Sequence, residues 1–331
     1  MPPQLSGVLF ALAGFAIFAT HDVVVKDLGA LYSPIQIVFF SVLFGFPIVT
    51  FLLMRDTVGG SLIPKNPGWT AIRTVASVLT GISAFYAFTV LPLAQVYAIL
   101  FAAPLLITIL AIPVLGERVG WRRWAAVIVG LGGVLVVLQP GVASISTGHL
   151  AALVAAIGGA VASVVMRRIG REERAVVMML YPMMANFVLM GAALAWVYEP
   201  MPAGDLAKSA IVSALALLAV FCIISAYRYA AAAIVAPMQY SQILWASIYG
   251  FVLFDESLDQ PTLIGSAIII ASGLFIVLRE ATGERSNTTP VLRTRSRPGS
   301  PAAPRVGTFL TKQERGDTGS TPSLARSDEE G

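Results

Sequence analysis

The sequence predicts an all-α integral membrane protein with ten transmembrane helices, arranged as two inverted five-helix repeats. Of its 331 residues, 57% are hydrophobic and only 12% are charged, whereas soluble domains carry about 25% charged residues. Long apolar runs match the ~20 helical residues that cross a hydrocarbon core, and they lack the polar–apolar alternation of membrane β-barrels. One pattern, a long apolar run, an acidic turn and a shorter apolar run, occurs twice in the chain.

Ten apolar stretches account for the predicted helices. The third and fourth are separated only by Leu91–Leu93, where Pro92 is expected to break the helix. The ten stretches cover residues 5–25, 33–54, 70–90, 94–115, 122–138, 149–167, 175–197, 209–228, 233–254 and 262–279.

The distribution of Lys and Arg predicts the orientation. If the N-terminus is cytoplasmic, twelve basic residues fall in cytoplasmic loops and helix ends, and only Lys26 and Lys208 fall on the opposite side. This bias follows the positive-inside rule, so we expect both termini in the cytoplasm and the protein in a bacterial inner membrane. The twelve are Arg55, Lys65, Arg73, Arg118, Arg122, Arg123, Arg167, Arg168, Arg171, Arg174, Arg228 and Arg279.

The repeated pattern predicts two halves, residues 5–138 and 149–280. A shift of 139 positions places Glu117 on Glu256. Each half has five stretches, an odd number, so the second half should enter the membrane in the opposite orientation. The basic residues agree, because those beside Glu117 have no basic counterpart beside Glu256. Inverted repeats are typical of secondary transporters; the alternative is a membrane scaffold that arose by duplication.

Residues 283–331 differ from the rest. They are rich in Pro, Ser, Thr, Gly and Arg, a composition that cannot bury enough apolar surface to fold. We expect a disordered cytoplasmic tail, passive rather than a binding segment for a partner or for anionic lipid.

Several classes of function have no support. The single Cys and the two widely separated His residues give no metal-ligand cluster. The sequence has no Gly-x4-Gly-Lys-Ser/Thr loop for ATP and no recognisable Ser/His/Asp motif. We therefore expect no enzyme activity, no metal, no cofactor and no nucleic-acid partner.

The end of the first stretch holds three ionisable residues: His21, Asp22 and Lys26. Ionisable groups in membrane helices are costly and usually face a cavity or a partner. Because His titrates near neutral pH, His21 and Asp22 are candidates for proton coupling or gating. The alternative is an interfacial helix end with a local Asp22–Lys26 ion pair.

Glu117 and Glu256 lie in the two acidic turns. They are candidate latches between the halves; helix capping and solvation are the alternative. Pro104, Pro113 and Pro237 lie within the fourth and ninth stretches, where they are candidate hinges.

Aromatic and polar residues mark a candidate cavity in the third, fourth and ninth stretches. The shift of 139 positions places Tyr240 on Phe101, and small-molecule pockets combine aromatic walls with a few polar groups. The alternative is that each polar group only satisfies a hydrogen bond between helices. The candidate cavity residues are Tyr86, Tyr97, Phe101, Gln239, Tyr240, Gln242 and Trp245.

One segment resembles a known family. Residues 87–141, AFTVLPLAQVYAILFAAPLLITILAIPVLGERVGWRRWAAVIVGLGGVLVVLQPG, resemble the first repeat of the drug/metabolite transporter superfamily, EamA-like branch. The resemblance covers about residues 5–280. It implies two inverted five-helix repeats and a central solute cavity lined by the third, fourth and ninth helices, which favours Tyr86, Tyr97, Phe101 and Tyr240.

The segment HDVVVKDLG is similar to a subgroup that includes S-adenosylmethionine uptake proteins and riboflavin- or amino-acid-related carriers. That subgroup often has Arg in its second helix, in a phrase like Phe-Phe-Arg. Here the phrase is Phe39-Phe40-Ser41, so no substrate is carried over.

These observations predict a secondary transporter that moves a small organic metabolite across the cytoplasmic membrane by alternating access. Amino-acid-like, nucleoside-like and vitamin-like solutes all remain open, with the proton as a candidate coupling ion and a homodimer as a candidate assembly. The alternative function is a membrane interaction or regulatory protein that transports nothing.

Overall fold

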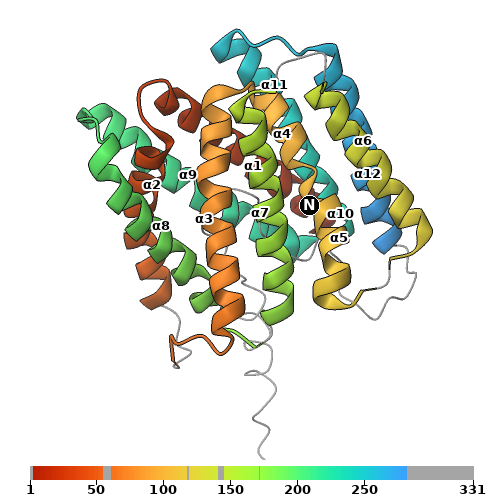
Figure 1. Cartoon of the computed structure of the whole chain (residues 1–331), viewed down its shortest axis with the longest axis horizontal. Coiled ribbons are helices and arrows are strands. Elements are labelled where there is room, and N and C mark those ends of the chain that lie inside the picture. Colours follow the sequence, from red (N-terminus) through yellow and green to blue (C-terminus); the bar gives the residue numbers. More distant parts are fainter. Residues whose placement is uncertain are drawn as a thin grey trace, which may run out of the picture.

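The computed structural model describes residues 3–54, 61–117, 119–140, 145–170, 172–230 and 232–281, a bundle of helices without a β-strand in these ranges (Figure 1). The predicted tail and Arg118 lie outside the described residues. The helices are α1 (Pro3–Gly29), α2 (Pro34–Met54), α3 (Pro67–Val90), α4 (Leu93–Leu100), α5 (Ala103–Leu115), α6 (Trp121–Leu138), α7 (Thr147–Ile169), α8 (Ala175–Val197), α9 (Ala203–Tyr229), α10 (Ala232–Val235), the 3₁₀ helix η1 (Ala236–Tyr240), α11 (Ser241–Phe254) and α12 (Gln260–Ala281).

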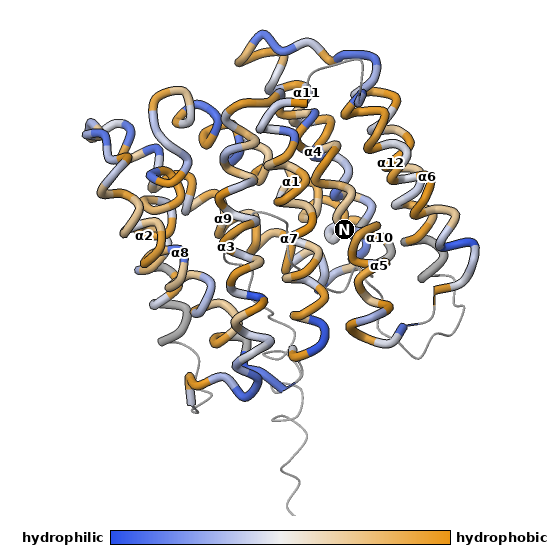
Figure 2. Tube along the Cα trace, viewed as in Figure 1, coloured by the Kyte–Doolittle hydropathy of each residue, from blue (hydrophilic) through white to orange (hydrophobic). Residues whose placement is uncertain are grey.

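Each of the ten predicted apolar stretches is helical, as expected of a multi-pass membrane protein. Among the described residues, seven helical segments are long and apolar enough to cross a membrane. Pro34–Pro47 of α2 and Gln260–Ile276 of α12 form shorter apolar helices. Figure 2 shows hydrophobic residues along the middle of the bundle and hydrophilic residues mostly at its two ends.

Bulky apolar side chains cover much of the outside of the bundle. Trp196 is 83% exposed, Trp121 75% and Phe251 70%. In water such a surface would be a liability for aggregation, whereas lipid tails solvate it.

The fourth and ninth stretches are interrupted at matching levels. The fourth breaks at Phe101–Ala102, between α4 and α5. In the ninth, η1 ends at Tyr240, which the shift of 139 positions equates with Phe101. A proline is the second residue of both α5 (Pro104) and η1 (Pro237). Proline removes a backbone donor from the hydrogen bonds of a helix. The rings of Phe101 and Tyr240 meet edge to face at 5.1 Å.

The helices pair across the two halves of the sequence. Three pairs join elements of the same rank in each half: α2 with α8, α4 with α11, and α6 with α12. Two further pairs, α1 with α9 and α3 with α7, exchange with each other when the halves are exchanged. Figure 1 shows α2 and α8 along one side of the bundle and α6 and α12 along the other.

The pair α6 and α12 packs at two glycines. A Cβ added to Gly265 would lie 2.6 Å from the carbonyl oxygen of Gly133, so only glycine permits this approach. Nearby, Ser272 Oγ donates a 2.8 Å hydrogen bond to the carbonyl of Ala126. Small residues with interhelical hydrogen bonds are the usual means of close helix packing in lipid.

The two acidic turns lie far apart. The connection between α5 and α6, with Glu117, is at one end of the bundle, and the connection between α11 and α12, with Glu256, is at the other (Figure 1).

Candidate functional site

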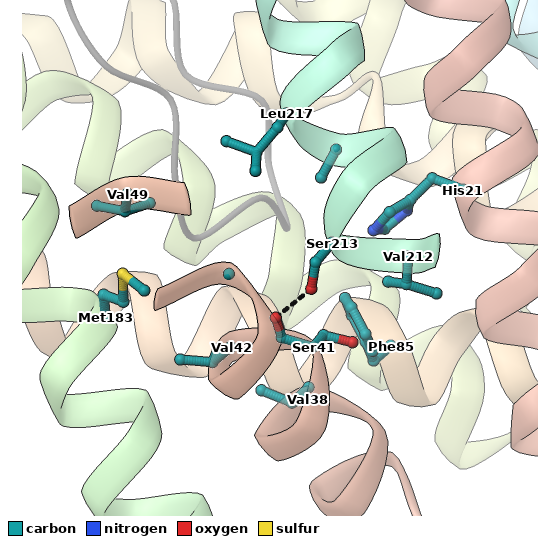
Figure 3. A pocket seen from close by; sticks show the side chains of 12 residues that line it. His21, Val38, Ser41, Val42, Val49, Phe85, Met183, Val212, Ser213 and Leu217 are labelled. Atoms are coloured by element: carbon teal, nitrogen blue, oxygen red, sulfur yellow. Dashed lines mark hydrogen bonds between the residues drawn. The ribbon is translucent and has the colours of Figure 1, made fainter. Parts of the chain in front are cut away.

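A pocket lies between five helices that come from both halves of the chain (Figure 3). It holds about 560 Å³ of empty space, including the part that is open to its surroundings. Most of its wall is aliphatic, with the Phe85 ring and the Met183 thioether. The lining residues are His21 of α1; Val38, Ser41, Val42, Gly45 and Val49 of α2; Phe85 of α3; Met183 of α8; and Val212, Ser213, Ala216 and Leu217 of α9.

Three polar side chains interrupt this apolar wall: His21, Ser41 and Ser213. Ser213 Oγ donates a hydrogen bond to the backbone carbonyl of Ser41 and so ties α9 to α2. The Ser41 hydroxyl itself is buried and has no hydrogen-bond partner among the described residues. A buried hydroxyl without a partner is uncommon and calls for an explanation.

His21 is backed by a buried carboxylate. Its Nδ1 lies 2.7 Å from Asp22 Oδ1, and Tyr97 Oη donates to Asp22 Oδ2. All three are almost fully buried, with His21 7% exposed and Asp22 and Tyr97 2% each. The imidazole packs edge-on against Phe18 and Phe85 at 6.4 and 6.0 Å between ring centroids. Because α1 turns 100° per residue, it sends His21 to the pocket while Asp22 faces α4.

Glu256 joins the second half to the first. Its Oε1 lies 2.6 Å from Lys26 Nζ at the end of α1, and its Oε2 accepts a 3.0 Å hydrogen bond from the N–H of Leu93, which begins α4. Lys26 also donates to the carbonyl of Leu91 at 2.6 Å and lies 5.3 Å from the Phe254 ring centroid.

Glu117 joins the first half to the second. Its Oε1 accepts a hydrogen bond from Arg167 Nη2 at the end of α7, and both side chains are under 10% exposed. The adjacent Arg168 donates to the carbonyl of Val114 and lies 4.8 Å from the Trp69 ring centroid. Charged pairs with this little exposure are far less screened than surface pairs.

The seven predicted cavity residues do not line this pocket. Tyr97 reaches it only through Asp22 and His21. Tyr86 Oη bonds Thr147 Oγ1 at 2.7 Å, Phe101 and Tyr240 contact each other, and Trp245 stacks with Tyr249 at 6.5 Å. Gln242 is buried and Gln239 half-buried. Their role in substrate binding stays a prediction.

The pocket residues on α2, α8 and α9 were missed by sequence reasoning. Ser41 was noted only because it stands where an Arg was expected, and Ser213 is one of many small residues in α9. These helices are apolar all round, so hydropathy does not separate a pocket face from a lipid face. Gln36, the one amide in α2, is no pocket residue: it exchanges hydrogen bonds with the backbone of Glu199 at 2.7 and 2.9 Å.

Comparison with known proteins gives consistent results. The profile of the EamA-like transporter family matches residues 5–139 and 146–278. The S-adenosylmethionine uptake transporter of Rickettsia felis is 26% identical over 83% of this chain and 94% of its own length. The pseudopaline exporter CntI of Pseudomonas aeruginosa is 27% identical over 81% of this chain and 94% of its own length. The riboflavin transporter of Vibrio cholerae is 27% identical over 85% of this chain and 96% of its own length.

A crystal structure of a protein 18% identical to this chain superposes with a TM-score of 0.56, covering 86% of this chain and 100% of the other. At that identity the match supports the fold alone. The family profile covers both halves of the helical region, and the relatives carry small metabolites in either direction. This chain therefore belongs to the EamA-like transporter family, and it is a multi-pass membrane transporter and not an enzyme.

Proposed function

We propose that this protein is a secondary transporter that moves a small organic metabolite across the bacterial inner membrane by alternating access. Residues 5–138 and 149–280 form two halves of opposite orientation, with both termini in the cytoplasm. The reciprocal helix pairing supports this arrangement, because exchanging the halves maps α2–α8, α4–α11 and α6–α12 onto themselves and α1–α9 onto α3–α7. The opposite positions of the two acidic turns support it as well (Figure 1).

The observation that carries the proposal is a pair of equivalent ion pairs. A similar sequence, a basic residue three positions before a glycine, occurs at the ends of α1 and α7. It is Lys26-Asp27-Leu28-Gly29 in α1 and, 141 positions later, Arg167-Arg168-Ile169-Gly170 at the end of α7. The two family matches begin at residues 5 and 146, which gives the same spacing. Each half thus contributes a base from its first helix to the acidic turn of the other half.

These ion pairs are suited to act as two gates. Lys26–Glu256 holds the halves together at one end of the bundle, and Arg167–Glu117 holds them at the other. Separation of the halves at either end requires that its ion pair break. The Arg167–Glu117 side chains are 7% and 5% exposed and the Lys26–Glu256 side chains 12% and 16%, so solvent screens each pair only weakly. Opening at one end while the other pair stays intact is the basic requirement of alternating access.

His21 and Asp22 are the proposed coupling residues. His21 contacts the pocket, and Asp22 connects it to Tyr97 of α4, next to the break at Phe101. A proton gained or lost here changes the charge between the pocket and a discontinuous helix, the kind of element in which transporters place coupling sites.

Transport itself is tested with the purified full-length chain in proteoliposomes. The vesicles are incubated with a mixture of amino acids, nucleosides and riboflavin, with and without a proton gradient, and their contents are measured by mass spectrometry. We expect accumulation of at least one solute above the level in protein-free vesicles.

A reversible cross-link between positions 26 and 256 tests whether uptake requires the halves to separate at that end. Cysteines replace Lys26 and Glu256 in a Cys222→Ala background, which removes the only native cysteine, and a reducible bifunctional thiol reagent joins them. Uptake should stop with the cross-link and return on reduction. If a folded preparation moves no solute, the alternative function of a non-transporting membrane interaction protein is favoured instead.

A further inference from the structure

We propose that the pocket selects an uncharged solute: an apolar body with one neutral hydrogen-bonding group that binds Ser41 Oγ and His21 Nε2. This inference rests on the proposed transport function and names the class of solute. Amides, hydroxyl compounds and heterocycles with adjacent N–H and C=O groups belong to this class.

The lining of the pocket offers no counter-ion from an acidic residue, Lys or Arg to a charged solute. None of the twelve lining residues is Lys, Arg, Asp or Glu. A charged group moved into such surroundings loses its hydration without a counter-ion, which disfavours binding strongly. Asp22 lies behind His21, and its two oxygens already accept hydrogen bonds from His21 and Tyr97. Lys26 and Glu256 are paired with each other at the end of the bundle.

The hydrogen-bonding groups carry the second step. In the neutral form of His21, the Asp22 carboxylate 2.7 Å from Nδ1 favours the tautomer with the proton on Nδ1, and Nε2 is then an acceptor. The Ser41 hydroxyl has no partner in the part of the chain that the structure describes. A ligand amide that reaches both groups would donate to Nε2 and accept from Ser41 Oγ. Figure 3 shows the His21 ring and the Ser41 side chain near Phe85 and Val212 on one side of the pocket.

The apolar wall carries the third step. Val38, Val42, Val49, Met183 and Leu217 line the remainder of the pocket, a surface that favours an aliphatic or aromatic body. Gly45 keeps this space open, because a Cβ placed there would meet only Met183 Cε, at 3.9 Å. A larger side chain at Gly45 would therefore project into the pocket without a clash of its Cβ with the backbone.

Three probes that share one ring system test the charge preference. Indole-3-acetamide is neutral, indole-3-acetate is an anion and tryptamine is a cation at pH 7. Binding to the purified full-length protein is measured by isothermal titration calorimetry. We expect the amide to bind at least tenfold more tightly than either charged probe. Equal or tighter binding of the acid or the amine overturns the proposal, and so does the absence of binding by all three.

Variants at the pocket identify the site. Ser41→Ala should weaken amide binding about fivefold, the effect of one neutral hydrogen bond, and Gly45→Val should abolish it. Ser41→Arg should reverse the preference toward the acid. Ser225→Ala is the matched control. Ser225 is a buried serine of α9 that does not line the pocket, and its hydroxyl donates to the carbonyl of Phe221 on its own helix, so this variant should bind the amide like the native protein. If Ser41→Ala, Gly45→Val and Ser225→Ala all retain a native melting temperature and native amide affinity, the assigned pocket is wrong.

Failure of this proposal is distinct from failure of the proposed function. Preference for a charged probe leaves transport by alternating access intact and overturns only the solute class. Tight amide binding at this pocket without movement of any solute across the vesicle membrane upholds the solute class and removes the transport function.

Discussion

At the scale of single residues, the sequence identified the ionisable groups but not their partners. His21, Asp22, Glu117 and Glu256 stand out because charge is rare in apolar stretches. Their partners are distant in the sequence: Asp22 contacts Tyr97, Glu117 contacts Arg167, and Glu256 contacts Lys26. No local spacing predicts which of several bases an acid will meet, since that depends on how the helices cross.

Asp22→Asn tests the coupling role. The amide keeps the size of the side chain but takes no charge, so gradient-driven accumulation should fall to the level of protein-free vesicles. Exchange of labelled for unlabelled solute across the vesicle membrane needs no net proton movement, so it should persist in this variant.

The control for this variant is Asp27→Asn. Asp27 lies on the same helix but forms an exposed ion pair with Lys208 at 2.7 Å, in which both side chains are over 40% exposed. Such pairs contribute little, so accumulation should be unchanged. Undiminished accumulation in Asp22→Asn would contradict the coupling role.

At the scale of elements, the ten helical stretches were predicted because hydropathy along the chain is a one-dimensional signal that lipid enforces directly. The prolines of the fourth and ninth stretches indicated weak points, and both stretches are interrupted near Pro104 and Pro237, whereas α5 continues through Pro113. The pocket was not predicted. Its wall comes from α2, α8 and α9, and the same Val, Leu and Met side chains serve equally well against lipid.

Gly265→Ala tests the packing of α6 against α12. The added methyl would press on the carbonyl oxygen of Gly133 at 2.6 Å and still more closely on Val137. Overpacking of this kind costs about 1–3 kcal/mol, so the melting temperature in detergent should fall by several degrees.

Gly132→Ala is the matched variant for the same helix pair. Nothing lies within 4 Å of a Cβ at Gly132, and alanine is favoured over glycine in a helix by about 1 kcal/mol. Its melting temperature should equal or exceed that of the native protein. If both variants melt alike, the close approach at Gly133 and Gly265 is not what stabilises this pair.

At the scale of the whole molecule, the repeat was visible in the sequence because its acidic turns and apolar runs recur in register. What the sequence did not reveal is that the helices pair across the halves, or that each acidic turn meets the first helix of the other half. These relations depend on three-dimensional packing and emerge only when both halves are present together.

Opposite orientation of the halves predicts opposite exposure of equivalent turns. Gly120 lies three residues after Glu117 in the connection between α5 and α6. Ser257 directly follows Glu256 in the connection between α11 and α12. In a Cys222→Ala background, Ser257→Cys should react with a membrane-impermeant maleimide added to intact cells, whereas Gly120→Cys should react only after permeabilisation. Reaction of both from one side would contradict the inverted arrangement.

The most direct test of alternating access uses the two gates separately. A cysteine at Ala216, a pocket position on α9, reports on access to the pocket when Cys222 is replaced by Ala. Glu256→Gln should speed its reaction with an impermeant thiol reagent from the extracytoplasmic side, and Glu117→Gln from the cytoplasmic side, each by about tenfold or more. Each variant removes one partner of an ion pair, which is partly buried for Lys26–Glu256 and almost fully buried for Arg167–Glu117. If both variants change access from the same side, or if neither changes it, the two ion pairs are not gates at opposite ends of one pathway.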